Sequence, residues 1–497
     1  MKELRDERIR KLNEIREMGV DPYPSKTNKD TKIGDIINDF KKFDGKKVTV
    51  AGRVIGIRKF GKIAFVVIRD FTGEIQLFLK DGDIDGSQKD GKDLDNLRLF
   101  DPGDFVEATG EVGKTQTGEI SVIVRRIKVL SKSLRPLPTK QDGFSNKEER
   151  LRRRYVDMNV NLDVRDRFVR RSKFWQATRD FLNKNEFIEI NTPVLEHTTG
   201  GADANPFTTH MDALDSDFYL RISHELPLKR LIGAGFERVY DIGPRFRNEN
   251  YSDEHLPEHI AMEWYAAYWD WHDGMKFMEK LFKEVLQKTF GTLKFELGEF
   301  KVDMSKKWEV WDYGEVIQKE YGIDVYNATI DEVKKALKAN KLEVEKTENL
   351  ARGIDKLWKK IRATVAGPVW LTNVPLFISP LAKTNADGKT TQRFHAIIAG
   401  SELCNGFSEL NDPQEQLNRF VEQQKMRDAG DNEAMMLDID FVEMLEYGMP
   451  PACGLGFSER VFWIFESVSA REGVPFPHLR AEVDEVTKGI YPELKLK

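Results

Sequence analysis

The feature that most constrains the fold is a run of five short, strand-like segments between residues 46 and 130. Each is rich in β-branched or aromatic residues, and turn residues such as Gly61, Thr72-Gly73 and Thr117-Gly118 separate them. The segments are 47–54, 64–68, 74–79, 105–108 and 120–124. Five short strands in about 85 residues predict a small closed barrel, of which the OB-fold is the commonest.

The rest of the chain alternates long helical patterns with strands. Helical periodicity covers 165–184, 262–290, 330–341, 413–428 and 456–467. A strand at 187–195 that meets Pro193 adds to an α+β domain on a mostly antiparallel sheet. We expect a charged helix at 1–18 and an exposed loop at 81–96. The predicted division is 1–135, a linker at 136–164, and a large domain at 165–497.

Charge and composition limit the classes of protein. The net charge is −5, but residues 1–150 carry +5 and the remainder carries −10. The overall value argues against a simple basic nucleic-acid binder, whereas the split suggests two tasks. Two cysteines, Cys404 and Cys453, favour a reducing compartment, and no run approaches the roughly 20 apolar residues of a membrane span. We therefore expect a cytoplasmic protein.

A stretch at 236–268 combines two strands with a polar loop. Its residues Arg247 and Glu249 would lie at one end of a pocket if the strand, the polar loop and the returning strand form a hairpin. An arginine can bind a phosphate or a carboxylate through two parallel hydrogen bonds. A surface ion pair on a hairpin is the alternative interpretation.

Two further stretches carry candidate ligand-binding groups. His395 and Glu402 are seven residues apart, so they converge only if the chain bends or changes register near Gly400. Carboxylates here would suit Mg²⁺, which binds together with nucleotide phosphates. Farther on, Gly454-Leu455-Gly456 is expected to open a helix that delivers Arg460, although turn glycines are common without any function.

In their order and combination, these segments resemble the class II aminoacyl-tRNA synthetases of the aspartate–asparagine–lysine subgroup, and within it the lysyl-tRNA synthetases. The resemblance covers nearly the whole chain. The segment around Pro193 resembles motif 1, which builds a homodimer interface; Arg247-x-Glu249 resembles motif 2; Gly454-x-Gly456 with Arg460 resembles motif 3. It implies an OB-fold anticodon-binding domain followed by a catalytic domain on an antiparallel sheet flanked by helices.

The resemblance also implies a substrate and a reaction. The stretches 200–202, 219–226 and 405–412 are lysine-type, and a lysine pocket needs aromatic walls and a terminal carboxylate. The implied reaction joins L-lysine to AMP with release of pyrophosphate, and then transfers lysine to the 3′ end of tRNA-Lys. The implied lysine contacts are Gly201, Glu225, Arg247, Glu263, Tyr265, Asn405, Phe407 and Glu409.

The same resemblance assigns the remaining sites. Arg247, Glu249 and Arg460 are the implied catalytic residues, and Glu402 with His395 the implied Mg²⁺ ligands. The implied ATP contacts are Arg247, Glu249, His255, His259, Glu402, Gly456 and Arg460. The implied anticodon contacts are Arg58, Phe65, Gln76 and Glu119; without the resemblance, Phe65 would be taken for barrel core.

The chain departs from the pattern of the family at four positions. His259 stands where a phenylalanine stacks on adenine, and His395 where a metal-binding carboxylate is expected. A neutral imidazole is a poor Mg²⁺ ligand, so we expect Glu402 to be the main one. Glu254 replaces a basic residue, and Glu186 replaces a glycine without expected consequence.

Two alternative functions remain open at this point. One is a ligase that attaches lysine to a protein, against which the predicted barrel argues. The other is a non-catalytic nucleic-acid-binding protein on the same scaffold, against which the complete set of lysine and ATP residues argues. Aspartate or asparagine is disfavoured as substrate because Glu409 stands where those pockets need a basic residue.

Overall fold

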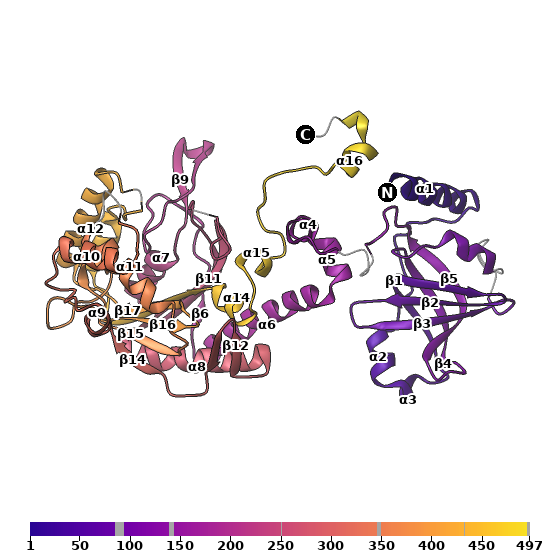
Figure 1. Cartoon of the computed structure of the whole chain (residues 1–497), viewed down its shortest axis with the longest axis horizontal. Helices are drawn as coiled ribbons and strands as arrows, with labels where there is room; N and C mark the ends of the chain where they lie inside the picture. Colours follow the sequence, from indigo (N-terminus) through magenta and orange to yellow (C-terminus); the bar gives the residue numbers. More distant parts are fainter. Residues whose placement is uncertain (85–93, 139–143, 250, 345–348, 432, 495–497) are drawn as a thin grey trace. The chain divides into compact units, whose positions relative to one another are not determined.

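The chain folds as two compact units (Figure 1). Unit 1 comprises residues 1–161 and 478–497, and unit 2 comprises residues 162–477. The structure, a computed structural model, describes residues 1–84, 94–138, 144–249, 251–344, 349–431 and 433–494. Most of the expected loop at 81–96 lies outside these residues. The bounds of the two domains and the linker that the sequence predicts, at residues 135 and 165, remain predictions.

Unit 1 contains a closed five-stranded barrel, as predicted. Its strands follow one another around the barrel in the order β1-β2-β3-β5-β4, with β3 and β5 parallel. Side chains alternate along each strand, so Ala64, Val66 and Ile68 of β2 are buried in the barrel core. The strands are β1 (Lys47–Phe60), β2 (Ile63–Arg69), β3 (Glu74–Lys80), β4 (Phe105–Lys114) and β5 (Ile120–Ser131).

Helices and the C-terminal residues complete unit 1. The predicted N-terminal helix is α1 (Lys2–Glu17), which buries Leu12 and Ile15. The other elements are α2 (Ile33–Asn38), α3 (Phe40–Phe43), η1 (Leu94–Leu99), α4 (Lys147–Arg152), α5 (Arg154–Val160), α16 (Glu485–Ile490) and η4 (Pro492–Leu494). Arg153 pairs with Asp484 at 2.9 Å, and the Arg5 guanidinium lies 5.3 Å from the Tyr491 ring.

Unit 2 is built on an eight-stranded sheet with the order β14-β15-β16-β17-β18-β11-β10-β6. All pairs between β15 and β10 are antiparallel, and only the two edge strands pair in parallel, which confirms the predicted α+β class. The strands are β6 (Ile188–Glu189), β10 (Arg238–Phe246), β11 (Glu258–Ala267), β14 (Glu309–Asp312), β15 (Val369–Thr372), β16 (Arg393–Ile398), β17 (Ser401–Ser408) and β18 (Ala452–Ser458).

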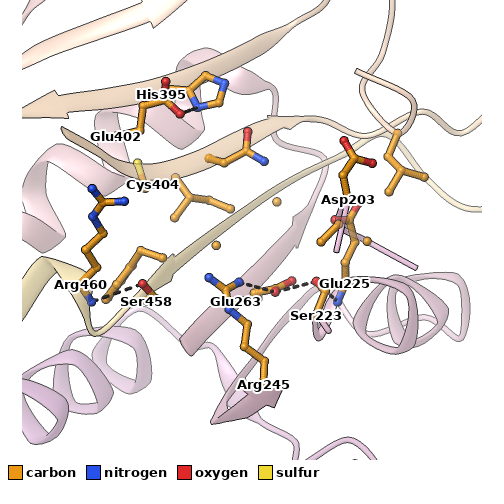
Figure 2. Close-up of a pocket in the computed structure, with 18 of the residues that line it drawn as sticks. Asp203, Ser223, Glu225, Arg245, Glu263, His395, Glu402, Cys404, Ser458 and Arg460 are labelled. Atoms are coloured by element: carbon orange, nitrogen blue, oxygen red, sulfur yellow. Dashed lines mark hydrogen bonds and ion pairs between the residues drawn. The ribbon is translucent and has the colours of Figure 1, made fainter. Parts of the chain in front are cut away.

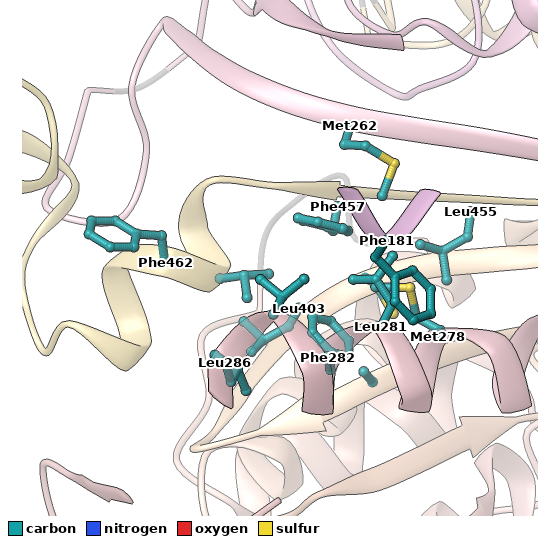
Figure 3. Packing of buried hydrophobic residues seen from close by; sticks show 14 of the residues in the cluster. Phe181, Met262, Met278, Leu281, Phe282, Leu286, Leu403, Leu455, Phe457 and Phe462 are labelled. Atoms are coloured by element: carbon teal, nitrogen blue, oxygen red, sulfur yellow. The ribbon is translucent and has the colours of Figure 1, made fainter. Parts of the chain in front are cut away.

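One face of this sheet is covered by two long helices, α6 (Leu162–Lys184) and α8 (Trp271–Phe290). Figure 3 shows Leu281 and Phe282 of α8 packing with Leu455 and Phe457 of β18. Because side chains alternate along β11, Met262 and Trp264 join this core while Glu263 and Tyr265 face the opposite side. That opposite face is where the candidate site lies.

Smaller groups of elements flank the sheet. The helices are α7 (Glu225–Gly233), α9 (Tyr313–Tyr321), α10 (Ile330–Ala339), α11 (Leu350–Arg362), α12 (Pro413–Asp428), α13 (Ile439–Tyr447), α14 (Arg460–Phe465) and α15 (Ala470–Gly473). The short elements are β7 (Leu195–Glu196), β8 (Thr208–Met211), β9 (Ser216–Leu220), β12 (Lys294–Leu297), β13 (Phe300–Asp303), η2 (Asp212–Leu214) and η3 (Leu376–Ile378). A separate apolar cluster joins α9, α10 and α11 to β15.

Three sequence-based assignments in unit 2 were wrong. Residues 262–267 belong to β11, since this central strand is buried on both faces and its apolar run mimics a helix. The expected strand at 187–195 is two two-residue strands, β6 and β7, separated by Pro193. Gly454 and Gly456 lie in strand β18, and the helix begins only at Arg460.

Candidate active site

A cavity of about 410 Å³ lies in unit 2 over β11, β17 and β18 (Figure 2). In Figure 2, Glu225 lies at one end, His395, Glu402 and Arg460 lie at the other, and Glu263 lies between them. The sequence-predicted residues that line it are Gly201, Glu225, Arg247, Glu249, His255, Glu263, His259, Tyr265, His395, Glu402, Asn405, Phe407, Gly456 and Arg460. Thus segments about 260 residues apart in the sequence converge on one cavity.

Carboxylates gather at the end formed by α7 and β11. Ser223 Oγ donates to Glu263 Oε1 at 2.7 Å, the His224 backbone N–H donates to the same atom at 3.1 Å, and Tyr265 Oη donates to Glu263 Oε2 at 3.2 Å. Burial raises the pKa of Glu263, but His224, Arg245 and Ser223 outweigh it and lower the pKa to about 2. Glu263 is therefore a fixed negative charge inside the cavity.

Glu409 lies behind the cavity wall, next to Gly454. Its side chain is 1% exposed, and a Cβ at Gly454 would lie 2.5 Å from Glu409 Oε1 and 2.2 Å from Tyr265 Cε1. Only glycine at 454 leaves this space open. Burial raises the pKa of Glu409 well above its usual value, and the neighbouring Lys229 opposes that effect.

Lys229 is a site residue that the sequence reasoning missed. It lies on α7, is fully buried, and its Nζ is 2.6 Å from Glu225 Oε1 and also pairs with the Glu409 carboxylate. The signal in the sequence was the spacing of four from Glu225, which places both side chains on one face of a helix.

Gly201 lies in the loop before β8. It lines the end of the cavity that contains Glu225 and Ser223. Its φ of +83° favours glycine, and a Cβ would lie 2.7 Å from the Glu225 Cβ and 2.8 Å from Ser223 Oγ. A close approach of the backbone to the carboxylates therefore requires glycine at this position.

Arginines and an amide occupy the middle of the cavity. Asn405 Oδ1 accepts from Arg393 Nε at 2.8 Å, which leaves the amide N–H donors of Asn405 for another partner. Arg245, which the sequence analysis did not single out, lies with its Nη1 atom 3.8 Å from Glu263 Oε1. The β10–β11 hairpin pairs Arg245 with His259 and holds Arg247 and Glu249 just past its strand end, as predicted.

The far end of the cavity holds Arg460 and His255 beside acidic side chains. The Arg460 Nη2 atom is 2.6 Å from Glu254 Oε2 and 3.4 Å from Ser401 Oγ. Burial first and then the charge of Arg460 lower the pKa of His255. Glu254, one of the four departures, thus neutralises the guanidinium that the sequence analysis assigned to phosphate.

His395 and Glu402 converge because β16 and β17 form a hairpin with a register shift between Ala396 and Ile397. Their closest atoms, His395 Nδ1 and Glu402 Oε2, are 3.7 Å apart. Trp358 Nε1 donates to Glu402 Oε1 at 2.7 Å, and Arg362 Nη1 lies 3.4 Å from that atom. Of the two alternatives, a bend or a register change near Gly400, the structure shows the bend, because the chain reverses between β16 and β17. Trp358 and Arg362 from α11 were not foreseen.

The charge states at this pair decide which metal would fit. Burial, then the charge of Arg393, lowers the pKa of His395 to about 4, so its imidazole is neutral at pH 7. Burial raises the pKa of Glu402, but His395, Arg362 and the Trp358 hydrogen bond lower it to about 2. The ionised Glu402 carboxylate fits Mg²⁺, whereas the neutral His395 imidazole does not. No group of three or more acidic, His or Cys side chains suited to a metal occurs among the described residues.

The four predicted anticodon contacts lie in unit 1, around β1, β2, β3 and β5. Phe65 alternates with buried Ala64 and Val66, so it faces outward, 5.4 Å from the Phe78 ring, and is not barrel core. Arg58 is its cross-strand partner. Gln76 accepts from Ser121 Oγ at 3.0 Å, and Glu119 directly precedes β5.

Comparisons with known proteins identify this combination of barrel and catalytic fold. Residues 146–480 match the family of tRNA synthetases class II (D, K and N), and residues 48–130 match the OB-fold nucleic acid binding domain of anticodon-binding proteins. The chain belongs to the class II tRNA synthetases.

Full-length relatives narrow the family further. The lysine–tRNA ligase of Thermotoga maritima is 41% identical over 486 residues, covering 96% of each chain. That of Roseiflexus sp. (strain RS-1) is 41% identical over 488 residues, covering 97% of this chain and 99% of the relative. Within this class, the chain belongs to the family of lysine–tRNA ligases. It is therefore an aminoacyl-tRNA ligase. None of the described helices is long and apolar enough to cross a membrane.

Proposed function

We propose that this chain activates L-lysine with ATP and transfers it to the 3′ end of tRNA-Lys in the cytoplasm. The observation that carries the proposal is the arrangement of groups in the cavity, with the buried carboxylates of Glu225 and Glu263 toward one end and Arg460 and His255 at the other. Lysine brings two ammonium groups to the first end, and ATP brings phosphates to the second. The carboxylate of lysine then lies between them, next to the α-phosphate.

The lysine end has a partner for each polar group of the substrate. The ε-ammonium group pairs with Glu409 and Tyr265, and the α-ammonium group with Glu225 and Glu263 beside the Gly201 backbone. Phe407 packs on the aliphatic stem. Arg247 and Asn405 bind the carboxylate. A buried carboxylate such as Glu409 rejects an uncharged side chain, because it would be left unpaired.

The first step is an in-line displacement that needs no proton transfer. A carboxylate oxygen of lysine attacks the α-phosphorus of ATP, a new O–P bond forms, and the bond to pyrophosphate breaks. Arg247 neutralises charge on the carboxylate and on the pentacoordinate phosphorus, so catalysis is positioning and electrostatic stabilisation. No covalent enzyme intermediate is required.

Other residues hold ATP in position. Glu249 accepts from the adenine amino group, His259 stacks on the ring, and the backbone at Gly456 allows close approach. His255 and Arg460 bind the outer phosphates once Glu254 is displaced. Mg²⁺ bound with ATP would be held by Glu402 and would neutralise phosphate oxygens.

In the second step the terminal 3′-hydroxyl of tRNA-Lys attacks the carbonyl carbon of lysyl-adenylate, and AMP leaves. Unit 1 would select the tRNA, with Phe65 stacking on an anticodon base while Gln76, Arg58 and Glu119 read its edges. Phe65→Ala is expected to reduce tRNA charging and to leave lysine-dependent ATP–pyrophosphate exchange unchanged. Phe71→Ala, at an exposed phenylalanine that directly follows β2 and its neighbour Asp70, is the control.

We also propose a homodimer through the motif 1 segment around Pro193. Support comes from two apolar side chains near it, Ile188 and Leu195, which are 52% and 38% exposed. A dimer would cover them. Ile188→Asp is expected to shift the sedimenting species from dimer to monomer, and a wild-type monomer contradicts the proposal.

The decisive experiment is ATP–pyrophosphate exchange with each of the 20 amino acids in turn. Exchange with lysine alone is expected, and exchange with aspartate, or with none, contradicts the proposal. Adding tRNA then separates the tRNA ligase from a ligase that lysylates a protein. Glu409→Gln should raise the lysine KM roughly 10- to 100-fold, as for a lost charged hydrogen bond of about 1.5–3 kcal/mol, while Glu446→Gln on the exposed side of α13 should not.

A further inference from the structure

Lys229 is a fully buried lysine within an enzyme site that binds lysine. Its Nζ is 2.6 Å from Glu225 Oε1, and it pairs at the same time with the carboxylate of Glu409. Both carboxylates are themselves buried, at 5% and 1% exposure. Charged side chains are almost never buried to this extent unless they are paired, so the three groups form one unit.

The surroundings of Lys229 connect it to the wall of the pocket. Its Nζ lies 5.1 Å from the Phe407 ring and 5.9 Å from the Phe441 ring of α13, which places the ammonium group behind the aromatic wall. The other titratable or charged groups that face these carboxylates are Glu263 and Tyr265 of β11, Arg393 of β16 and Cys453 of β18. Lys229 is the ammonium group within ion-pair distance of both carboxylates.

The charges of the unit have a simple consequence. When both carboxylates are ionised, they and the Lys229 ammonium group carry a net charge of −1, which one further ammonium group neutralises. We infer that Lys229 is a positioning residue for substrate specificity: it fixes the net charge of the pair formed by Glu225 and Glu409 at a value that an ammonium group of the substrate neutralises. This inference rests on the proposed function, because that function assigns both glutamates to lysine.

Removal of the Lys229 charge would change how the glutamates ionise. Burial raises the pKa of Glu225 and of Glu409, and Lys229 is the first group that opposes this. Without it, two carboxylates face one another in a dry site, and one of them takes up a proton. A protonated carboxyl group does not pair with an ammonium group, so lysine binding becomes weaker as the pH falls.

The test is the lysine KM in ATP–pyrophosphate exchange from about pH 6 to pH 8.5. We expect a flat profile for the wild type and, for Lys229→Met, a rise of roughly tenfold or more in lysine KM toward low pH, with an unchanged ATP KM. Lys229→Gln also lacks the charge and should share this profile, which covers the case that Lys229→Met does not fold. Lys229→Arg keeps the charge and should restore the flat profile.

Lys283→Met is the matched control. Lys283 forms an ion pair with Glu279 at the same spacing of four and the same 2.6 Å, but on the half-exposed side of α8. Its profile should follow the wild type. The inference is overturned if both neutral variants at 229 keep a flat profile, or if Lys229→Arg shows the same pH dependence as they do. A wild type without lysine-dependent exchange contradicts the proposed function instead.

Discussion

The Nε atom of Arg245 donates a hydrogen bond of 2.8 Å to Nε2 of His259. Because Nε2 is the acceptor, the ring proton lies on Nδ1, which is 3.3 Å from the Leu256 carbonyl oxygen. Burial, and then the charges of Arg245 and Arg247, lower the pKa of His259 well below its usual value. His259 is thus a neutral imidazole in one tautomer, and it orients Arg245 toward Glu263.

This hydrogen bond predicts that replacing His259 by phenylalanine, the residue usual in the family, lowers the stability of the protein. His259→Phe would leave a buried Arg245 N–H without its acceptor, which costs about 1–3 kcal/mol. We expect the urea unfolding transition to move to lower denaturant concentration. His210→Phe, on the exposed β8–β9 hairpin, should move it much less. An unchanged transition for His259→Phe would show that the hydrogen bond adds no stability.

Gly454→Ala tests the space between Tyr265 and Glu409. A methyl group there would lie 2.2 Å and 2.5 Å from these two side chains, closer than any real contact. We expect lysine-dependent exchange to fall at least tenfold with a folded protein and an ATP KM close to that of the wild type. Gly489→Ala, where nothing lies within 4 Å, is the control. Full activity of Gly454→Ala would mean that lysine does not enter this space.

Trp358→Phe removes the hydrogen bond of 2.7 Å to Glu402. If Glu402 holds Mg²⁺, the loss of this orienting contact should raise the Mg²⁺ concentration for half-maximal exchange roughly tenfold, as expected for an outer-shell partner. Trp311→Phe removes a similar indole–carboxylate hydrogen bond, to Glu309 at 3.0 Å, and should have no such effect. Equal Mg²⁺ curves for the two variants would exclude this role of Trp358.

His395 predicts a pH dependence of stability. Its pKa is about 4 when folded, against 6.5 for an ordinary histidine, so the unfolded chain binds the proton first. The contribution of the neutral His395 to the free energy of unfolding is therefore fully present above pH 6.5. It decreases as the pH drops from 6.5 toward 4. At 1.36 kcal/mol per pKa unit the loss amounts to roughly 3 kcal/mol. Unfolding by urea should show a shallower decline for His395→Gln, and parallel curves would contradict the assignment.

Local pattern was sufficient for much of the fold. The alternation along β2 and the turn glycines predicted the barrel, and Asp412-Pro413 marks the start of a helix that covers 413–428 as expected. The hairpin that carries Arg247 and Glu249 could also be predicted, because it consists of two adjacent strands. These features depend on residues close together in the sequence.

The features that could not be predicted depend on burial between distant segments. The spacing of four places Lys229 near Glu225, but only the packed structure shows that no solvent reaches it. Trp358 and Arg362 meet Glu402 only because α11 packs beside β16 and β17. Burial also explains why residues 262–267 were predicted as helix and not as strand. A strand buried on both faces lacks the alternation by which strands are recognised.

The placement of residues 478–497 in unit 1 has a consequence for how the protein is made. Because both ends of the chain belong to this unit, the whole of unit 2 is, in topology, an insertion into it. A ribosome synthesises unit 2 before α16, whose flanking residues Asp484 and Tyr491 contact Arg153 and Arg5 of unit 1. Residues 478–497 therefore join unit 1 only after unit 2 has been synthesised, so the folding of unit 1 depends on segments that lie on both sides of the catalytic unit in the sequence.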